Sequence, residues 1–185
     1  FSRSMGKGQT RLKRFLFLIL FSLAASARAE DPAVRIGNPL LARHPASGDA
    51  RPRSIWDLHT FNSRIYLAHG DYWNDSGPTD LWTYSGTGTN FINEFSPDDE
   101  MVWDFFEYDE HLLIPGVDAM ESWAFANIYI NDPLQTNQAG WTKQRTLPDG
   151  RHSFEAALFK SNLYASLTRS DYTGRTMVST NMGMT

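Results

Sequence analysis

From residue 54 onward, short runs rich in aromatic and β-branched residues alternate with turn-forming residues. Runs of this composition fit strands, and no stretch after residue 30 shows the long 3.6-residue apolar period of an amphipathic helix. The pattern therefore predicts an all-β protein. The runs are SIWDLHTF, RIYLAHG, TDLWTYSG and NFINEFS, then MVWDFFEY, HLLIPGV, WAFANIYI and WTKQRTL, and finally SFEAALF, NLYASLT and RTMVST.

The same order of residues recurs at the start of each group of runs. The segment WDLHTFNSRIYLAHGD from Trp56 aligns without gaps with WDFFEYDEHLLIPGVD from Trp103 and with FEAALFKSNLYASLTR from Phe154. Each segment opens with an aromatic residue and an acid, and a second aromatic residue follows at the same spacing. The segments begin 47 and 51 residues apart. A period of about 40–50 residues made of strands is typical of a β-propeller blade.

The repeat predicts a β-propeller fragment preceded by a signal peptide and a linker. We expect two complete four-stranded blades, residues 54–99 and 100–149, and a third, residues 150–185, that is truncated after three strands. A propeller removes its sheet edges by closing into a ring of about 4–8 blades. We therefore expect this chain to be incomplete, and residues 30–185 alone to be insoluble, oligomeric or molten.

The end of the third segment carries a family resemblance. It resembles the bacterial extracellular β-propellers with BNR/Asp-box, or sialidase-like, repeats, in which a hairpin carries Ser-x-Asp-x-Gly-x-Thr-Trp. Ser179, Gly183 and Thr185 match that motif, and Asn181 stands where Asp is usual. An Asp-box is a folding hairpin, so the resemblance implies a fold and assigns no catalytic residue.

The N-terminus has the pattern of an export signal. Four basic residues between Lys7 and Arg14 precede the apolar run FLFLILFSLAA, and Ala27 and Ala29 form a small-x-small site before Glu30. This pattern predicts a signal peptide over residues 1–29, cleaved near Ala29/Glu30, and a secreted or periplasmic protein without a stable membrane span. The alternative is an uncleaved anchor, although the run is short for a span of about 20 residues. Residues 30–53 are predicted to be a linker with one short strand in AVRIGNPL.

Charge and composition narrow the class of partner. The net charge is −4, but residues 1–29 hold six basic residues and no acidic one, so the remainder has a net charge of −10. Nucleic-acid binders present a basic surplus to the phosphates, and this chain offers none. The absence of Cys excludes disulfides and thiolate metal sites. No metal-ligand spacing or cofactor motif is present, so we predict neither a metal nor a cofactor.

Propeller geometry gathers acidic residues on one face of the molecule. First strands line the central channel, so the acids that follow the repeated aromatic residues would lie near its mouth. Further acids would lie on the loops after the second strands and on the inter-blade loops around Asp99, Glu100 and Asp149, with Trp73 beside them. The candidate ligand-binding residues are Asp57, Asp71, Trp73, Asp104, Asp118 and Glu155.

Two interpretations of these acids remain open. Carboxylates accept hydrogen bonds from sugar hydroxyls, and aromatic rings stack on sugars or hold cations. Alternatively Asp57, Asp104 and Glu155 cap backbone N–H groups where each blade begins, because repeats keep their packing units.

The predicted function is a secreted ligand-binding or scaffold module for an extracellular carbohydrate or protein ligand. The alternative is a sialidase-like glycan-processing enzyme, a glycoside hydrolase or lyase, with catalytic residues partly in missing blades. Glycoside hydrolysis needs two carboxylates at a defined separation.

Overall fold

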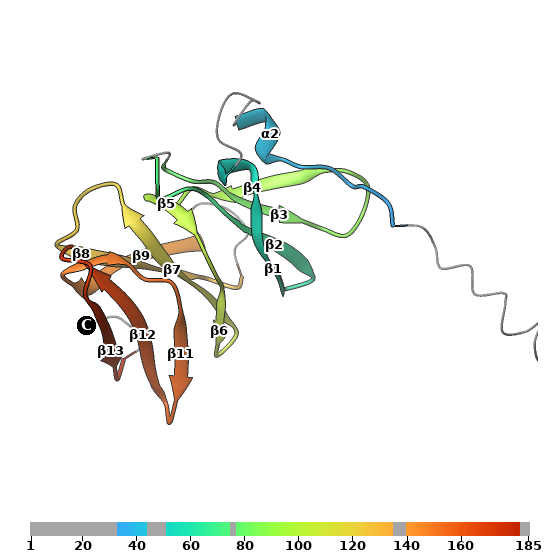
Figure 1. Ribbon diagram of the computed structural model, residues 1–185. Coiled ribbons are helices and arrows are strands. Elements are labelled where there is room, and N and C mark those ends of the chain that lie inside the picture. Colours follow the sequence, from blue (N-terminus) through green and yellow to red (C-terminus); the bar gives the residue numbers. More distant parts are fainter. Residues whose placement is uncertain (1–32, 44–50, 75–76, 135–139, 182–185) are drawn as a thin grey trace, which may run out of the picture. The chain divides into compact units, whose positions relative to one another are not determined.

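The computed structural model describes residues 33–43, 51–74, 77–134 and 140–181 (Figure 1). Every described helix and strand belongs to the unit formed by residues 36–185. The predicted signal peptide lies outside the described residues. None of the described helices is both long enough and apolar enough to cross a membrane.

Thirteen strands and two short helices make up the described fold, which confirms the all-β prediction. The helices are α2 (Leu40–Arg43) and η1 (Arg51–Arg53). The strands are β1 (Ile55–Phe61), β2 (Arg64–His69), β3 (Leu81–Tyr84), β4 (Phe91–Phe95), β5 (Asp99–Val102), β6 (Phe106–Tyr108), β7 (His111–Ala119), β8 (Phe125–Asn131), β9 (Trp141–Pro148), β10 (Gly150–His152), β11 (Ala156–Phe159), β12 (Asn162–Arg169) and β13 (Gly174–Ser179).

These strands form two antiparallel sheets. The first is a four-stranded meander in the order β1-β2-β3-β4. The second has nine strands, of which six follow the path β11-β12-β10-β7-β8-β9, while β13 pairs with β12 and both β5 and β6 pair with β7. We refer to β1–β4 as the first module, β5–β9 as the second and β10–β13 as the third.

The sequence repeat corresponds to a repeated hairpin. The turns between β1 and β2, between β6 and β7, and between β11 and β12 each have two central residues, both with positive φ. Two such residues define a type I′ turn, whose twist matches that of the strands it joins. The turns are Asn62-Ser63 (φ 46° and 60°), Asp109-Glu110 (45° and 66°) and Lys160-Ser161 (49° and 65°).

The second and third modules share one sheet, and the described strands do not close into a ring. The prediction that each blade has its own sheet is wrong for the second and third modules, because β10 pairs with both β7 and β12. Gly150 permits this position, since a Cβ there would lie 2.5 Å from the Cβ of Ala126.

The first strand of the second module is also broken in two. The run MVWDFFEY forms β5 and β6, both on β7, with Trp103–Phe105 between them. Asp104 explains the break, because its Oδ1 accepts a hydrogen bond from the backbone N–H of Phe105 at 2.7 Å and so occupies that donor locally.

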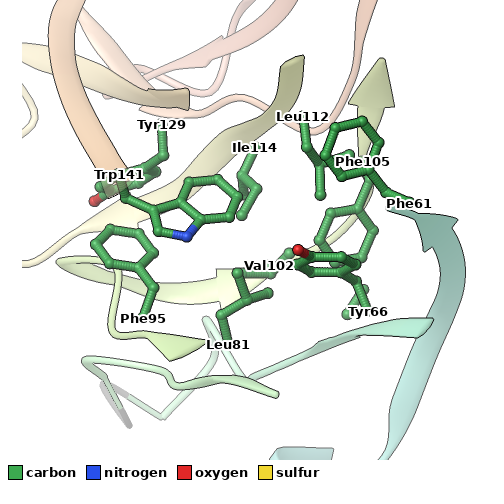
Figure 2. Packing of buried hydrophobic residues seen from close by; sticks show 11 residues of the cluster. Phe61, Tyr66, Leu81, Phe95, Val102, Phe105, Leu112, Ile114, Tyr129 and Trp141 are labelled. Carbon is green, nitrogen blue, oxygen red and sulfur yellow. The ribbon is translucent and has the colours of Figure 1, made fainter. Parts of the chain in front are cut away.

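Successive modules pack face to face, and the second module has two apolar faces. Alternate residues of a strand point to opposite faces, so Leu112 and Ile114 of β7 face the first module while Leu113 faces the third. The first interface, shown in Figure 2, is largely aromatic and contains Phe61, Tyr66, Ala68, Leu81, Phe95, Val102, Phe105, Leu112, Ile114, Tyr129 and Trp141. The second interface contains Leu113, Ala126, Ile128, Leu147, Leu163, Ala165 and Leu167.

Part of the predicted linker belongs to the folded body. Within residues 33–43 the expected strand is absent, because Asn38 starts α2 instead: its Oδ1 accepts a hydrogen bond from the backbone N–H of Leu40 at 3.0 Å. Leu40 is fully buried. A Cβ at Gly37 would lie 3.1 Å from a ring carbon of Phe91 on β4. Gly37 and the start of α2 therefore lie against the first module (Figure 1).

Candidate functional site

The aromatic residues that open the three repeats contact one another in sequence: Trp56 stacks on Trp103, and Trp103 meets Phe154 edge to face. The ring centroids of Trp56 and Trp103 are 5.7 Å apart, and those of Trp103 and Phe154 are 5.6 Å apart. The indole N–H of Trp56 donates to the carbonyl of Gly70 at 3.2 Å. One residue type at one position of the repeat thus builds a continuous aromatic column across all three modules.

The column continues onto the loop that follows β2. The ring of Tyr72 lies 5.9 Å from that of Phe154, 5.0 Å from that of His152 and 5.1 Å from that of Trp73. Trp73 is 66% exposed, and the Arg51 guanidinium lies 5.9 Å from its ring centroid. The column therefore ends in an aromatic ring that solvent can reach.

A pocket of about 430 Å³ lies at the loop between β7 and β8. Two buried acids, Glu100 and Asp118, and the exposed Glu121 give it an acidic lining. His152 connects it to the aromatic column, because its ring packs on Tyr72 while its Nε2 lies 3.2 Å from Asp118 Oδ2. The lining residues are Glu100, Asp118, Ala119, Met120, Glu121, Ser122 and Trp123. We call this pocket and the column the aromatic–acidic surface.

Asp118 is held tightly at the wall of this pocket. Its carboxylate accepts hydrogen bonds from the indole N–H of Trp123 at 2.6 Å and from two guanidinium nitrogens of Arg151 at 3.3 Å each. Burial raises the pKa of Asp118, but the hydrogen bond from His152 and the charge of Arg151 outweigh it, so the pKa lies below its ordinary value. Its φ of 62° is uncommon for a residue other than glycine.

Arg151 also joins Asp118 to aromatic side chains on either side. Its guanidinium carbon lies 4.0 Å from the ring centroid of Trp123 and 5.2 Å from that of Tyr172. The same guanidinium donates to the Tyr172 hydroxyl at 2.6 Å. These contacts tie the β12–β13 turn to the pocket.

Asp71 shapes the loop that carries the exposed indole. It is buried, and its carboxylate accepts hydrogen bonds from the backbone N–H of Trp73 at 3.0 Å and from the Asn74 amide at 2.6 Å. Its own N–H donates to the carbonyl of Glu100 at 3.2 Å. The alignment placed both acids on the loops after the second strands; Asp71 does follow β2, but Asp118 lies within β7, and both carboxylates are bonded within the protein.

The acids that follow the repeated aromatic residues are more accessible. Asp57 and Asp104 are half-buried and Glu155 is exposed. Asp104 bonds to a backbone N–H, as the capping interpretation expects, while the Glu155 backbone N–H donates to Ser166 Oγ at 3.1 Å. The structure thus brings Asp71, Asp118 and Trp73 to the aromatic–acidic surface, with Asp57, Asp104 and Glu155 each next to a residue of the column.

The Asp-box-like residues are described in part. Ser179 Oγ donates to Asn181 Oδ1 at 2.8 Å and accepts from the Asn181 backbone N–H at 3.3 Å, which is a local turn contact. Gly183 and Thr185 lie outside the described residues.

One acid that the sequence assigned to an inter-blade loop proves to be deep in the protein. Asp99 begins β5 and is 1% exposed. Its Oδ2 accepts hydrogen bonds from Asn127 Nδ2 at 2.7 Å and from the Tyr129 hydroxyl, while its Oδ1 has no hydrogen-bond partner among the described residues. Burial raises the pKa of Asp99 to about 6. A Cβ at Gly116 would meet the carboxylate at 2.5 Å, so the paired strand provides the space.

The residues that sequence reasoning missed are His152, Tyr72 and Arg151. His152 and Arg151 come two and three residues before Phe154, and Tyr72 comes immediately before Trp73, so their proximity to the repeated positions is the only signal that the chain carries for them.

Searches against protein-family models, curated proteins and solved structures find no match for this chain. Within the described ranges, no cluster of three or more His, Asp or Glu side chains is arranged to hold a metal ion.

Proposed function

We propose that this chain is an exported ligand-binding module of the β-propeller repeat type, and that carbohydrate binds to its aromatic–acidic surface. The observation that carries the proposal is the aromatic column: three repeat-opening rings contact one another in sequence and lead through Tyr72 to the exposed Trp73, while His152 links Tyr72 to the acidic pocket.

The chemistry of this surface suits a sugar. The apolar face of a pyranose ring stacks on an indole, while its hydroxyls donate to carboxylates or accept from a guanidinium. Trp73 provides an indole ring that is 66% exposed, with the Arg51 guanidinium 5.9 Å from its centroid. The pocket provides Glu121 and Trp123 beside the anchored Asp118. Export, inferred from residues 1–29, would bring such a surface into contact with extracellular glycans.

The repeat supports the propeller part of the proposal. The modules recur with the same type I′ hairpin and pack face to face through alternating apolar residues. Such a recurring hairpin and face-to-face packing are expected of blades arranged around an axis, and the proposal takes the shared strand β10 as a join between two blades.

The proposal is tested with a glycan array probed by the full chain. We expect saturable binding of at least one glycan class, lost in Trp73→Ala and kept in Phe159→Ala, a matched control that removes another exposed aromatic ring at the β11–β12 turn. Equal binding by both variants and the native chain would contradict the assignment of this surface.

One observation favours a second candidate, glycan hydrolysis or lyase chemistry. Glu100 and Asp118 line the same pocket, and such reactions use two acidic groups. Glycans retained on the array should then be cleaved by the native chain, and Glu100→Gln should abolish cleavage while binding persists. If the glycan stays intact after prolonged incubation, the chain binds glycan without cleaving it.

A further inference from the structure

A buried acid adjoins the pocket of the aromatic–acidic surface. Asp99 begins β5, and the next residue, Glu100, lines the pocket. The Asp99 carboxylate forms no salt bridge with a described residue; its contacts there are hydrogen bonds from Asn127 and Tyr129. A carboxyl group buried without a cation favours its protonated form. Burial is the main cause that raises the pKa of Asp99 to about 6, while the two hydrogen bonds act in the opposite direction.

A continuous chain of hydrogen bonds connects Asp99 to the loop that forms the pocket. Asn127 Nδ2 donates to Asp99 Oδ2 at 2.7 Å, and the carbonyl oxygen of the same side-chain amide accepts from Arg145 Nη1 at 3.1 Å. Arg145 also donates to the Glu121 carboxylate at 2.9 Å, and to the carbonyl and the hydroxyl of Ser122 at 3.2 Å each. Glu121 and Ser122 line the pocket. Asn127 therefore lies between the buried acid and the cation that holds the pocket loop.

The charge on Asp99 determines how firmly this chain holds. An ionised carboxylate accepts a stronger hydrogen bond than a protonated one. A stronger bond to the Asn127 amide polarises it and makes its carbonyl oxygen a better acceptor for Arg145, because the bonds of a chain reinforce one another. Ionisation of Asp99 therefore positions Arg145 more firmly against the loop between β7 and β8, and protonation loosens it.

The other ionisable groups around Asp99 do not form a second connection of this kind. The Tyr129 hydroxyl donates to the same Oδ2, and burial raises its pKa, so it stays protonated. Lys143 on β9 donates to Asp98 at 2.7 Å and to Glu121. Among the described residues, Asn127 is the one side chain that bonds to both Asp99 and Arg145. Further ionisable side chains on the adjoining elements include Asp80, Asp98, Glu100, Asp118, Arg151 and His152.

We propose that the protonation state of Asp99 regulates the pocket: the ionised acid, acting through Asn127 and Arg145, fixes the loop between β7 and β8 in its ligand-binding arrangement, and the protonated acid releases it. The regulation of ligand binding rests on the proposed function, whereas the coupling between Asp99 and the loop does not. Coupling between two sites is reciprocal, so a ligand that fixes the loop favours ionised Asp99. Acidification of the surroundings would then release bound glycan.

The coupling is tested without ligand by an NMR pH titration of the full chain that follows the backbone amides of Glu121 and Ser122. In the native chain we expect both amide resonances to shift with a midpoint near pH 6. Asp99→Asn keeps the shape of the side chain but cannot titrate, so this step should vanish. Asp109→Asn, the same change at an exposed site in the β6–β7 turn, should leave the step unchanged.

Arg145→Gln separates the hydrogen-bond chain from a general electrostatic effect. Asp99 keeps its own titration in this variant, and the pH dependence of the unfolding free energy reports it, but the connection to the loop is interrupted. The step near pH 6 should therefore disappear from the two loop amides while the pH dependence of stability persists. Any effect of His152, which bonds to Asp118 at the pocket, is common to the native chain and the variants.

The regulation is tested by repeating the glycan array at pH 5 and at pH 7. From pH 7 to pH 5, the apparent affinity for retained glycans should fall about fivefold in the native chain and in Asp109→Asn, and less than about twofold in Asp99→Asn.

Three results would overturn the coupling: no step in the native chain, an equal step in Asp99→Asn, or a step that persists in Arg145→Gln. Glycans retained with equal affinity at both pH values would overturn the regulation and leave the proposed function intact. An array that retains no glycan at either pH would instead contradict the proposed function, and the amide titration would still decide whether Asp99 controls the loop.

Discussion

The two interfaces of the second module differ in chemistry although the same strands build both. The first is aromatic and includes a hydrogen bond across it: the buried carboxylate of Glu94 on β4, held within the first module by Arg64 at 2.8 Å and by the Tyr66 hydroxyl at 3.1 Å, accepts from the Trp141 indole of β9 at 3.3 Å. The second is aliphatic, with small residues, and opens into a groove. Directional hydrogen bonds fix the relative position of two faces, whereas aliphatic packing is less specific. We therefore expect the first interface to be the more rigid of the two.

The largest expected effect compares two leucines at the two interfaces. Leu112→Ala should lower the free energy of unfolding by about 3–5 kcal/mol, because the surrounding aromatic core cannot collapse around the cavity. Leu163→Ala should lower it by about 2–3 kcal/mol, since Leu163 already borders the open groove. Urea unfolding of both variants measures the difference. Equal losses would mean that the groove does not loosen the second interface.

The buried acid near the first interface gives a pH effect of the next size. Folded Asp99 keeps its proton up to about pH 6, whereas an unfolded aspartate loses it near 3.8. The folded state therefore binds more protons between these values, and stability falls as pH rises from about 4 to about 6, by on the order of 2–3 kcal/mol.

Asp99→Asn isolates that contribution, because asparagine has a similar shape and cannot lose a proton in this range. Its unfolding free energy should be flatter than that of the native chain between pH 4 and pH 6 in urea titrations at each pH. Asp57→Asn, at a half-buried site, serves as the control and should keep the native slope. An unchanged slope in Asp99→Asn would assign the pH dependence to other groups.

The link between the second and third modules predicts a smaller loss. Asp118→Asn removes the charge that holds Arg151 and His152 and should cost about 1–3 kcal/mol at pH 7, against less than about 0.5 kcal/mol for Asp57→Asn. Because the pKa of Asp118 is lowered, its contribution is present above about pH 4 and is lost as pH falls through the folded pKa. Thermal melts at pH 7 and pH 3 measure both effects. Equal costs for the two variants would contradict the structural role of Asp118.

The features that could be predicted from the sequence depend on residues a few positions apart in the chain. Strand periodicity and the two-residue turns follow from residue types a few positions apart, so the all-β class and the recurring hairpins could be recognised from spacing alone. The break between β5 and β6 depends on Asp104, whose side chain accepts a hydrogen bond from the backbone N–H of Phe105 that would otherwise pair with a neighbouring strand. Strand periodicity in the sequence cannot predict such a bond.

Long-range contacts explain what the sequence missed. The pairing of β10 with β7 joins His152 to Val117 across 35 residues and needs the absence of a side chain at Gly150. The candidate site likewise combines features that nearby residues determine with features that depend on long-range contacts. The alignment placed Asp71 and Asp118 at equivalent loop positions, but their burial depends on Asn74, Trp123 and Arg151, which the alignment does not relate.

The smallest expected effect concerns the hairpin turn of the third module. Lys160 and Ser161 both have positive φ, a conformation that costs a side chain energy and that glycine adopts freely. Ser161→Gly should therefore raise the free energy of unfolding by about 0.5–1 kcal/mol, because type I′ turns favour glycine at their second position. Thr176→Gly, in the extended strand β13, is the control and should lower stability by a similar amount, since glycine weakens a strand. Urea midpoints resolve differences of this size. If the third module unfolds with the other two, the gain appears in the single transition. If the aliphatic interface allows it to separate first, the gain appears only in an early transition, and that result would sharpen the contrast between the two interfaces.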